Sequence, residues 1–404
     1  MNRYDAIVVG GRVAGAATAL LLARAGARVV LVERGRRGSD TVSTHALMRA
    51  GVMQLSRWGL LDAVVASGAP PVRRTLFHYE DGETVQVSIR PHAGVDALYA
   101  PRRHVLDTLL VDAAAEAGVE VRHSTTVTGL LRDRYSRVHG VRTVDAAGRR
   151  VELCAPITIG ADGIRSVVAD QVGAPVVRRG SHAGAVLYRY FTDLEVAGYE
   201  WAFGDRAAAG MIPTNDGATG VFVSSRPERM RTLRRLGQEE AFATLLGQVS
   251  PGLAARASRA VPTGRIHGWA GVPGHVRRSW GLGWALVGDA GYFKDPITAH
   301  GMTDGLRDAE LLADGVLDVL AGGVPECEAL SRYQRTRDRL SHQLFGVTEA
   351  VAGYAWSTEE VRGLLLQLSA SMTDEVEHLQ GLPDRRIGAG LSANIPPDTV
   401  PAPG

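Results

Sequence analysis

The sequence predicts an α/β protein in which a parallel sheet is interleaved with a mainly antiparallel sheet and followed by further helices. Three observations lead to this prediction. Residues 4–32 have the pattern of a strand, a helix and a second strand in immediate succession, which is the unit of a parallel sheet. Residues 74–89 and 184–224 contain short strand patterns of the kind that pair in antiparallel sheets. Residues 330–379 carry long amphipathic helical runs.

The composition indicates large cores and argues against a charged macromolecular partner. The 404 residues are 45% hydrophobic, and 45 basic against 43 acidic residues give a formal net charge of +2. This near-balance argues against charge-driven binding to nucleic acid or to a membrane surface. The two cysteines are too few for a disulfide framework or a cysteine zinc site, and no metal cluster stands out. We find no signal peptide and no apolar stretch long enough to span a membrane, so a cytoplasmic location is expected.

The N-terminal residues predict two buried strands, over residues 4–9 and 29–32, on either side of a helix over residues 14–25. A glycine-rich turn joins the first strand to the helix. Gly10 lets the chain turn sharply off the strand, and Gly15 lets the helix pack close to the sheet. A helix that begins beside such a turn presents free N–H groups and a positive dipole end to a phosphate.

The residues around this turn predict a dinucleotide site. Val13 and Ala14 open the helix, and Glu33 ends the second strand, where a carboxylate can accept hydrogen bonds from an adenosine ribose. Arg12 replaces the middle glycine of the usual fingerprint, so its backbone and its guanidinium are both available to a phosphate. Arg34, which follows Glu33, is included in the expected site.

The middle of the chain predicts a helix, a hairpin, a second helix and then several strands. The helical patterns cover residues 47–66 and 103–117. The hairpin covers residues 74–89 and turns at Asp81-Gly82. Strands and turns alternate over residues 119–160, and irregular segments are expected between the strands that follow.

Two later strands end in acidic residues. Asp162 follows the strand that ends near residue 160, and Ser166 can cap the helix after it. Asp289 follows another buried strand, where a carboxylate can accept hydrogen bonds from polyol hydroxyls. The next loop opens a helix at Met302, whose free N–H groups can hold negative charge on a ligand.

With these three motifs in this order, the sequence resembles the FAD-dependent aromatic hydroxylases of the p-hydroxybenzoate hydroxylase type, which are group A flavoprotein monooxygenases. The resemblance covers about residues 4–345. It implies a Rossmann-like FAD-binding domain interleaved with a mainly antiparallel β-sheet substrate domain, plus C-terminal helices. The implied FAD-binding domain comprises residues 1–73, 97–175 and 264–325, and the substrate domain comprises residues 74–96 and 176–263. Residues 326–387 would form the C-terminal helices, and residues 388–404 a disordered tail.

The resemblance also implies which residues bind FAD. Arg49 lies in an Arg-Ala-Gly-Val stretch similar to the family's, and Arg103 matches the arginine of its R-x-x-L helix start. Ala299 stands where the family usually has glycine. The complete implied set is Gly10, Arg12, Val13, Ala14, Gly15, Glu33, Arg34, Arg49, Arg103, Val127, Asp162, Gly288, Asp289, Pro296, His300, Gly301 and Met302.

The implied reaction is hydroxylation of a small phenolic or tropone-type ring, in secondary metabolism. NAD(P)H would reduce the flavin, and O2 would then form a flavin C4a-hydroperoxide that transfers one oxygen. The expected partners are therefore the aromatic substrate, O2 and NAD(P)H, and the chain is expected to be a monomer or a homodimer.

Catalytic and substrate-binding residues are expected on two segments. Pro296 would lie beside the isoalloxazine ring. His45, in the loop before the helix that carries Arg49, can hydrogen-bond a phenol or relay its proton, because the ordinary histidine pKa is about 6.5; a purely structural histidine is the alternative. The residues expected to line the substrate pocket are His45, Tyr188, Tyr190, Trp201, Phe203, Met211, Pro213 and Phe222. Because strands alternate their faces, about half of the strand residues should point away from it.

Three other functions share this cofactor fingerprint. Flavin-dependent halogenases use a catalytic lysine in the N-terminal third and a W-x-W-x-I-P motif. The only lysine here is Lys294, and the motif is absent, which argues strongly against halogenation. Isoprenoid reductases of the geranylgeranyl reductase type, and an FAD-binding protein without enzymatic activity, remain open alternatives.

Overall fold

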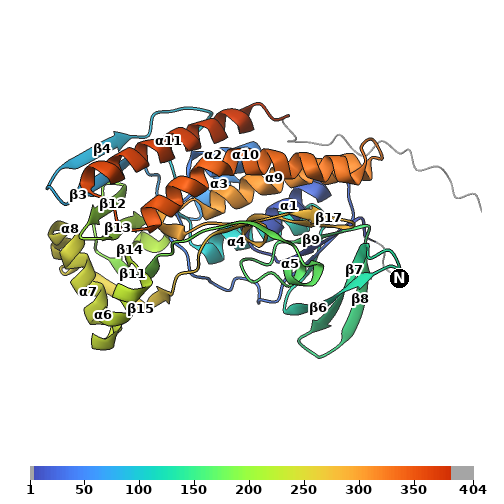
Figure 1. Ribbon diagram of the computed structural model, residues 1–404, viewed down its shortest axis with the longest axis horizontal. Helices are drawn as coiled ribbons and strands as arrows, with labels where there is room; N and C mark the ends of the chain where they lie inside the picture. The colour runs from blue at the N-terminus through green and yellow to red at the C-terminus, as the bar shows by residue number, and fades with distance from the viewer. Residues whose placement is uncertain (1–3, 384–404) are drawn as a thin grey trace, which may run out of the picture.

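In the computed structural model, which describes residues 4–383, the chain folds around two large sheets (Figure 1). The first has the strand order β17-β18-β9-β1-β2-β5, and only β17 runs antiparallel to its neighbour. Its strands are β1 Ala6–Val9, β2 Val29–Val32, β5 Glu120–Arg122, β9 Ile157–Gly160, β17 Trp280–Gly281 and β18 Trp284–Leu286. The residues of β1, β2 and β9 are all buried, as expected for apolar strands covered on both faces. The predicted parallel sheet is confirmed.

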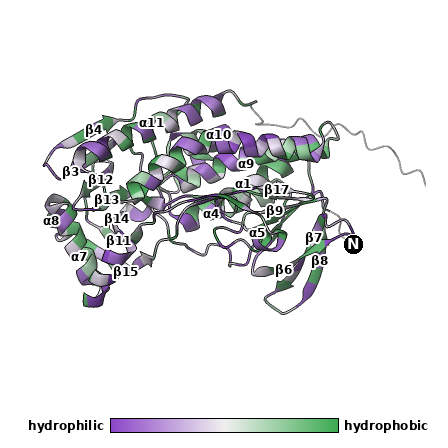
Figure 2. Cartoon of the chain, viewed as in Figure 1, coloured by the Kyte–Doolittle hydropathy of each residue, from purple (hydrophilic) through white to green (hydrophobic). Residues whose placement is uncertain are grey.

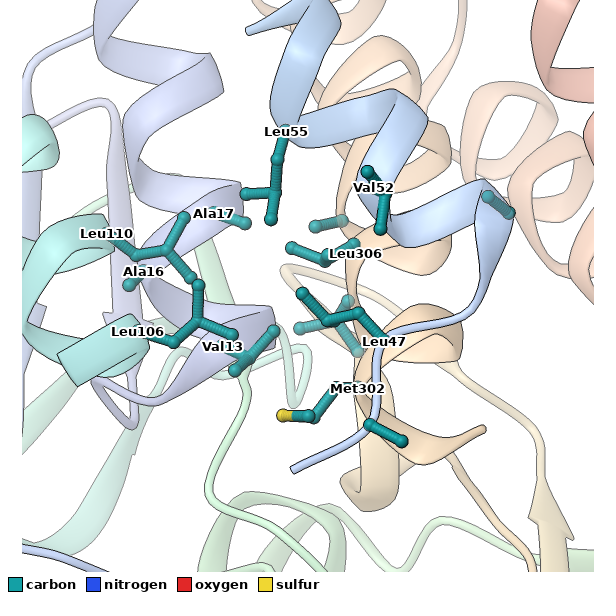
Figure 3. Close-up of a cluster of buried hydrophobic side chains, with 14 of the residues drawn as sticks. Val13, Ala16, Ala17, Leu47, Val52, Leu55, Leu106, Leu110, Met302 and Leu306 are labelled. Carbon is teal, nitrogen blue, oxygen red and sulfur yellow. The ribbon is translucent and has the colours of Figure 1, made fainter. Parts of the chain in front are cut away.

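Helices from distant parts of the chain pack together on this sheet. They are α1 Val13–Arg24, α2 Arg49–Arg57, α3 Leu61–Ala66, α4 Arg103–Glu116 and α9 Gly301–Leu320. Figure 3 shows apolar side chains of α1, α2, α4 and α9 pointing toward one another, with Leu47 among them. The helix predicted over residues 47–66 is divided into α2 and α3, because Gly59 between them takes a left-handed φ of 69°.

The second sheet has the order β15-β11-β14-β13-β12-β3-β4, and all its neighbouring pairs are antiparallel except β12 with β3. Its strands are β3 Arg74–Tyr79, β4 Thr84–Ser88, β11 Ala185–Thr192, β12 Tyr199–Gly204, β13 Ala207–Pro213, β14 Thr219–Ser225 and β15 Val261–Trp269. Its outer face is covered by α6 Pro227–Leu233, α7 Gln238–Val249 and α8 Pro251–Ala257 (Figure 1). Strand β15 continues past the expected boundary at residue 263 to Trp269, while the division of the chain into domains stays a prediction.

Strands β12 and β13 stand where irregular structure was expected. The turn between them uses Asp205 and Arg206, both with positive φ (44° and 55°), instead of the usual Asn-Gly or Asp-Gly pair. Strand β13 begins with three alanines, which have a weak intrinsic preference for strands. Pairing with β12 and β14 and burial against α7 stabilise β13 instead.

Two smaller sheets and three more helices complete the fold. The sheets are β6-β7-β8 (Thr125–Arg132, Val138–Asp145, Arg150–Cys154) and β10-β16-β19 (Val176–Arg179, His275–Arg277, Tyr292–Phe293). Helix α5, Val167–Val172, begins at Ser166, whose hydroxyl accepts a hydrogen bond from the Ala169 N–H, so the predicted cap is confirmed.

The C-terminal part of the described chain is helical, as predicted. Helices α10 Glu326–Ala352 and α11 Thr358–Gln380 lie along one side of the molecule (Figure 1). Figure 2 shows hydrophilic and hydrophobic residues mixed along both helices, which fits helices with one face against the protein. Within residues 4–383 we find no helix that is both long and apolar enough to cross a membrane. The tail predicted over residues 388–404 lies outside the described residues.

Candidate functional site

A cavity of about 650 Å³ lies where β1, β2, β9 and β18 end, beside the inner face of the second sheet. Ligands of open α/β sheets bind at this place, outside the carboxyl ends of the strands. Most of the residues expected to bind FAD line the cavity: Gly10, Arg12, Val13, Ala14, Glu33, Arg34, Arg103, Val127, Asp162, Gly288, Asp289, Pro296, Gly301 and Met302. Segments that are far apart in the sequence therefore meet around one space.

The glycines of the first turn are packed so tightly that no side chain fits there. Gly10 has a φ of 107°, and a Cβ added to it would lie 2.4 Å from the carbonyl oxygen of Ala161. A Cβ on Gly15 would lie 1.8 Å from the carbonyl oxygen of Gly10. Gly15 does not line the cavity itself, but it holds α1 against the turn and so brings the N–H groups of α1 to the cavity.

Glu33 is held in place by two backbone groups. The N–H of Gly11 donates to Oε2 at 2.6 Å, and the N–H of Gly35 donates to Oε1 at 2.5 Å. A carboxylate has about four acceptor positions. The two hydrogen bonds thus orient Glu33 and leave acceptor capacity for the hydroxyls of a ribose.

The guanidinium of Arg12 is turned toward α4. It donates to Oδ2 of Asp107 at 2.7 Å and to the carbonyl oxygen of Ser39 at 2.7 Å, while Arg103 bonds the other carboxylate oxygen of Asp107. Asp107 therefore fixes two of the expected cofactor residues at the cavity wall. Contact between the Arg12 guanidinium and a phosphate stays a prediction.

The two acidic residues at strand ends differ in their surroundings. Asp162 accepts hydrogen bonds from the Ser166 hydroxyl at 2.5 Å and from the Val167 N–H at 2.6 Å, so it anchors the start of α5. Burial raises the pKa of Asp162. Asp289 keeps some accessible surface toward the cavity but lies deep in the protein, and this burial raises its pKa to about 6, against the opposing effect of Arg103 and Lys294.

Two further residues expected to bind FAD do not line the cavity. Arg49 donates instead to the backbone carbonyls of Arg90, His92 and Val95, at 2.8, 3.1 and 2.9 Å. His300 is buried at the start of α9, and its Nδ1 lies 3.2 Å from Oδ1 of Asp304. Direct contact of either side chain with FAD stays a prediction.

His300 belongs to a buried charge cluster that the sequence did not predict. We define the cluster as Lys294, His300, Asp304, Arg307, Asp308 and Glu375. Lys294 Nζ contacts Oδ2 of Asp304, and Arg307 donates to Oδ1 of Asp304 at 3.0 Å. Glu375, from α11, lies 2.9 Å from Arg307 and 3.0 Å from Nε2 of His300. No sequence pattern links Glu375 to the motif at residue 289, because only the tertiary fold brings α11 to this place.

A polar aromatic group lies beside the part of the cavity wall that Thr44, Ala46 and Tyr188 form. His45 and the Tyr190 hydroxyl share a hydrogen bond through Nε2, and Tyr190 meets the ring of Tyr188 edge to face at 5.8 Å. The guanidinium of Arg102 stands 4.0 Å from the centre of the Tyr190 ring. Burial lowers the pKa of His45 to about 3, and the nearby Arg102 acts in the same direction. His45 is therefore neutral over the physiological pH range.

Five of the strand residues expected to line the substrate pocket lie on the inner face of the second sheet, so the expectation that about half point away is wrong. Tyr188 lines the cavity, while Tyr190, Trp201, Phe203 and Phe222 pack behind it in the core between the sheets. Met211 was wrongly assigned to the pocket, since it packs with Phe242 and Leu245 in the core under α7. Alternation along β13 explains this, because Ile212, the next residue, faces the inner side.

Pro213, at the end of β13, and His45 are also absent from the cavity lining, although Thr44 and Ala46 on either side of His45 belong to it. The cavity has further wall residues that sequence reasoning missed, among them Val186, Trp269, Val272 and Phe293. The two-residue period of β11 carries a signal for Val186, which precedes Tyr188 by two positions.

The comparisons with known proteins agree with this geometry. A family model described as "FAD binding domain" matches residues 3–348. A digeranylgeranylglycerophospholipid reductase of Methanothrix thermoacetophila is 27% identical over 363 residues, covering 85% of each chain. A putative polyketide hydroxylase of Streptomyces halstedii is 25% identical over 357 residues, covering 80% of this chain and 60% of the hydroxylase.

Solved structures show the same fold. PqsL of Pseudomonas aeruginosa, described as a probable FAD-dependent monooxygenase, superposes with a TM-score of 0.77 at 24% identity, covering 90% of this chain and all of PqsL (100%). The flavin-dependent brominase Bmp2 superposes with a TM-score of 0.79 at 17% identity, covering 94% of each chain. The chain belongs to the FAD-binding domain family, shares its fold with these solved structures, and is a flavin-dependent oxidoreductase.

Proposed function

We propose that the protein is an FAD-dependent monooxygenase that uses NAD(P)H and O2 to hydroxylate a small aromatic ring. The observation that carries this proposal is the state of His45 beside the cavity. Its Nδ1 is buried and has no hydrogen-bond partner, its Nε2 bonds Tyr190, and its backbone takes a left-handed φ of 63°. Strain and an unpaired polar atom at one residue each cost about 1–3 kcal/mol and are typical of functional positions.

The residues that would hold FAD fit its chemistry from end to end. Glu33 has acceptor capacity for the ribose, the N-terminus of α1 offers N–H groups to the pyrophosphate, and Asp289 lies on the cavity wall for the polyol chain. Pro296, Gly301 and Met302 line the end that would receive the isoalloxazine ring. Bound FAD supplies the chemistry that takes electrons from NAD(P)H and activates O2.

The protein's own part in hydroxylation is to position the ring and move its proton. Tyr188 lines the cavity next to Tyr190, so a phenol packed against Tyr188 lies close to the pair formed by Tyr190 and His45. Because burial keeps the imidazole neutral, Nε2 of His45 can take the proton of the Tyr190 hydroxyl as Tyr190 takes that of the phenol, and the proton returns to the ring oxygen along the same hydrogen bonds after oxygen transfer. A phenol that loses its proton this way becomes more electron-rich toward an electrophilic oxygen.

A second candidate function is the FAD-dependent reduction of alkene double bonds. The match to this chain covers 85% of the reductase of M. thermoacetophila, but only 60% of the polyketide hydroxylase. Such a reaction consumes no O2. The hydroxylase relative favours the first candidate and a role in secondary metabolism.

Oxygen uptake separates the two candidates. We would measure NAD(P)H oxidation and O2 uptake by the FAD-loaded protein with phenolic, tropone-type and isoprenoid compounds. Hydroxylation predicts O2 uptake that an aromatic compound stimulates and an oxygenated product detected by mass spectrometry. Anaerobic turnover of an isoprenoid alkene, without aromatic-stimulated O2 uptake, would assign the protein to the reductases, and flavin binding without any turnover would contradict both.

A further inference from the structure

Lys294, the only lysine of the chain, is buried in the wall of the FAD cavity. Its Nζ contacts Asp304, which also lines the cavity, and lies 5.3 Å from the centre of the Tyr292 ring. Asp289 and Pro296, on either side of Lys294 in the sequence, belong to the same wall. A lysine that is 5% exposed is unusual, because burial of an ammonium group is unfavourable unless a counter-charge is present.

The rest of the buried charge cluster leaves the counter-charges in excess. Arg307 bonds three carboxylates, those of Asp304, Asp308 and Glu375, at 3.0, 2.7 and 2.9 Å. Burial lowers the pKa of His300, and Glu375 acts in the opposite direction. Lys294 and Arg307 face three carboxylates, so loss of Lys294 would leave Arg307 and the titratable His300 against three anions.

The field of this cluster already reaches the cavity wall. Lys294 lowers the pKa of Asp289, and Asp308 raises it. Lys294 and Asp308 therefore change the pKa of Asp289, a residue of the cavity wall, in opposite directions, although neither is hydrogen-bonded to Asp289. Charges in a buried region are screened weakly by solvent, so the same field acts on any ligand in the cavity.

We propose that Lys294 is a positioning residue whose positive charge stabilises the reduced flavin. This charge offsets the negative charge of the cluster's carboxylates, which disfavours the reduced flavin. Hydride transfer from a reduced nicotinamide breaks its C–H bond, forms an N–H bond on the oxidised flavin, and yields the oxidised nicotinamide and a flavin with one additional negative charge. Lys294 favours this product, while Asp304, Asp308 and Glu375 oppose it. The inference depends on FAD binding and not on the substrate or the oxygen chemistry proposed above.

Two substitutions of opposite charge test the proposal. K294M removes the cation, and D308N removes one anion. In Asp308 only Oδ1 accepts from Arg307, while Oδ2 has no partner, so an asparagine can keep both hydrogen bonds and place its amide nitrogen at the unpaired position. We would titrate the flavin of each loaded protein against a reference redox dye at pH 6.5, below the pKa of about 7 to which burial lowers Lys294.

We expect K294M to reduce the equilibrium constant for flavin reduction at least tenfold, which lowers the two-electron midpoint potential by about 30 mV. D308N should raise the midpoint potential. K294R keeps the positive charge, so its equilibrium constant for flavin reduction should stay within threefold of the wild-type value. Shifts of the same sign in K294M and D308N, or an unchanged potential in K294M, would overturn the proposal. If K294M does not retain FAD, the midpoint potentials of D308N and K294R still test the proposal. An unchanged or lowered potential in D308N would also contradict the proposal. The midpoint potentials are measured without substrate turnover. A protein that is not a hydroxylase would therefore fail the O2-uptake assay but could still show the expected potentials.

Discussion

The substitution of Gly15 by alanine should disrupt FAD binding through packing alone. The Cβ would lie 1.8 Å from the carbonyl oxygen of Gly10 and 2.9 Å from the Cβ of Ala161. Ordinary contacts between such atoms are about 3.5 Å, so α1 and the turn must separate by about 1.7 Å to accept the methyl group. Overpacking of this kind costs about 1–3 kcal/mol, and it moves the N-terminus of α1 away from the pyrophosphate position.

The expected result is a rise of at least tenfold in the FAD dissociation constant, about 1.4 kcal/mol, together with a lower Tm. The affinity would be measured by titrating apo-protein with FAD and following flavin fluorescence, and occupancy from the ratio of flavin to protein absorbance. Gly363→Ala is the matched control, since nothing lies within 4 Å of its added Cβ in α11. Alanine at that helical position should raise stability by about 0.5–1 kcal/mol and leave FAD binding unchanged. A Gly15→Ala protein with wild-type FAD affinity and Tm would refute the packing argument.

Three other predictions concern Asp289, Met211 and Tyr188. Asp289→Ala should lose FAD occupancy, and full flavin content would contradict the assignment. In the apo-protein, the raised pKa of Asp289, about 6, means that the folded state binds a proton between about pH 4 and pH 6 that the unfolded state does not. Wild-type stability should therefore fall relative to Asp289→Asn as the pH rises through this window, by up to about 3 kcal/mol in denaturant titrations, and a pH-independent difference would contradict the burial argument. Met211→Ala should cost about 2–5 kcal/mol of stability without changing the affinity for an aromatic ligand, whereas Tyr188→Phe should change that affinity with little loss of stability. Weakened ligand binding in stable Met211→Ala protein would place Met211 back in the pocket.

Much of the cofactor site could be predicted because its signals are local. The turn at Gly10, the helix after it and Glu33 lie within one strand–helix–strand unit, where backbone geometry constrains the residue types. The same is true of Ser166, which caps α5 as predicted and also donates to Asp162. Gly10, Glu33 and Asp162 line one cavity because the strands that carry them are neighbours in one parallel sheet.

The features that were missed depend on contacts between distant segments. The face of Met211 follows from the pairing of β13 with its neighbours, and its alanine-rich sequence gives no strand signal of its own. The link from Glu375 to His300 requires α11 to pack on α10 and α2, so that the Glu375 side chain reaches the start of α9. Arg49 matches a family stretch, yet its guanidinium is bound to carbonyls of the loop over residues 90–95, which the stretch itself does not reveal.

The wall of the cavity must distinguish hydroxylation from alkene reduction, because the chain is similar in sequence to both classes of relative over most of its length. An alkene requires no proton acceptor in the wall, whereas a phenol does. His45→Phe removes both ring nitrogens, and Tyr190→Phe removes the hydroxyl that bonds one of them. If the protein is a hydroxylase, each variant should retain FAD and lose aromatic-stimulated O2 uptake by about 10²-fold or more, the usual contribution of acid–base catalysis. The double variant should be no slower than the slower single variant, because the two residues act as one pair. Retention of wild-type O2 uptake in both variants would show that the strained His45 has a structural role only.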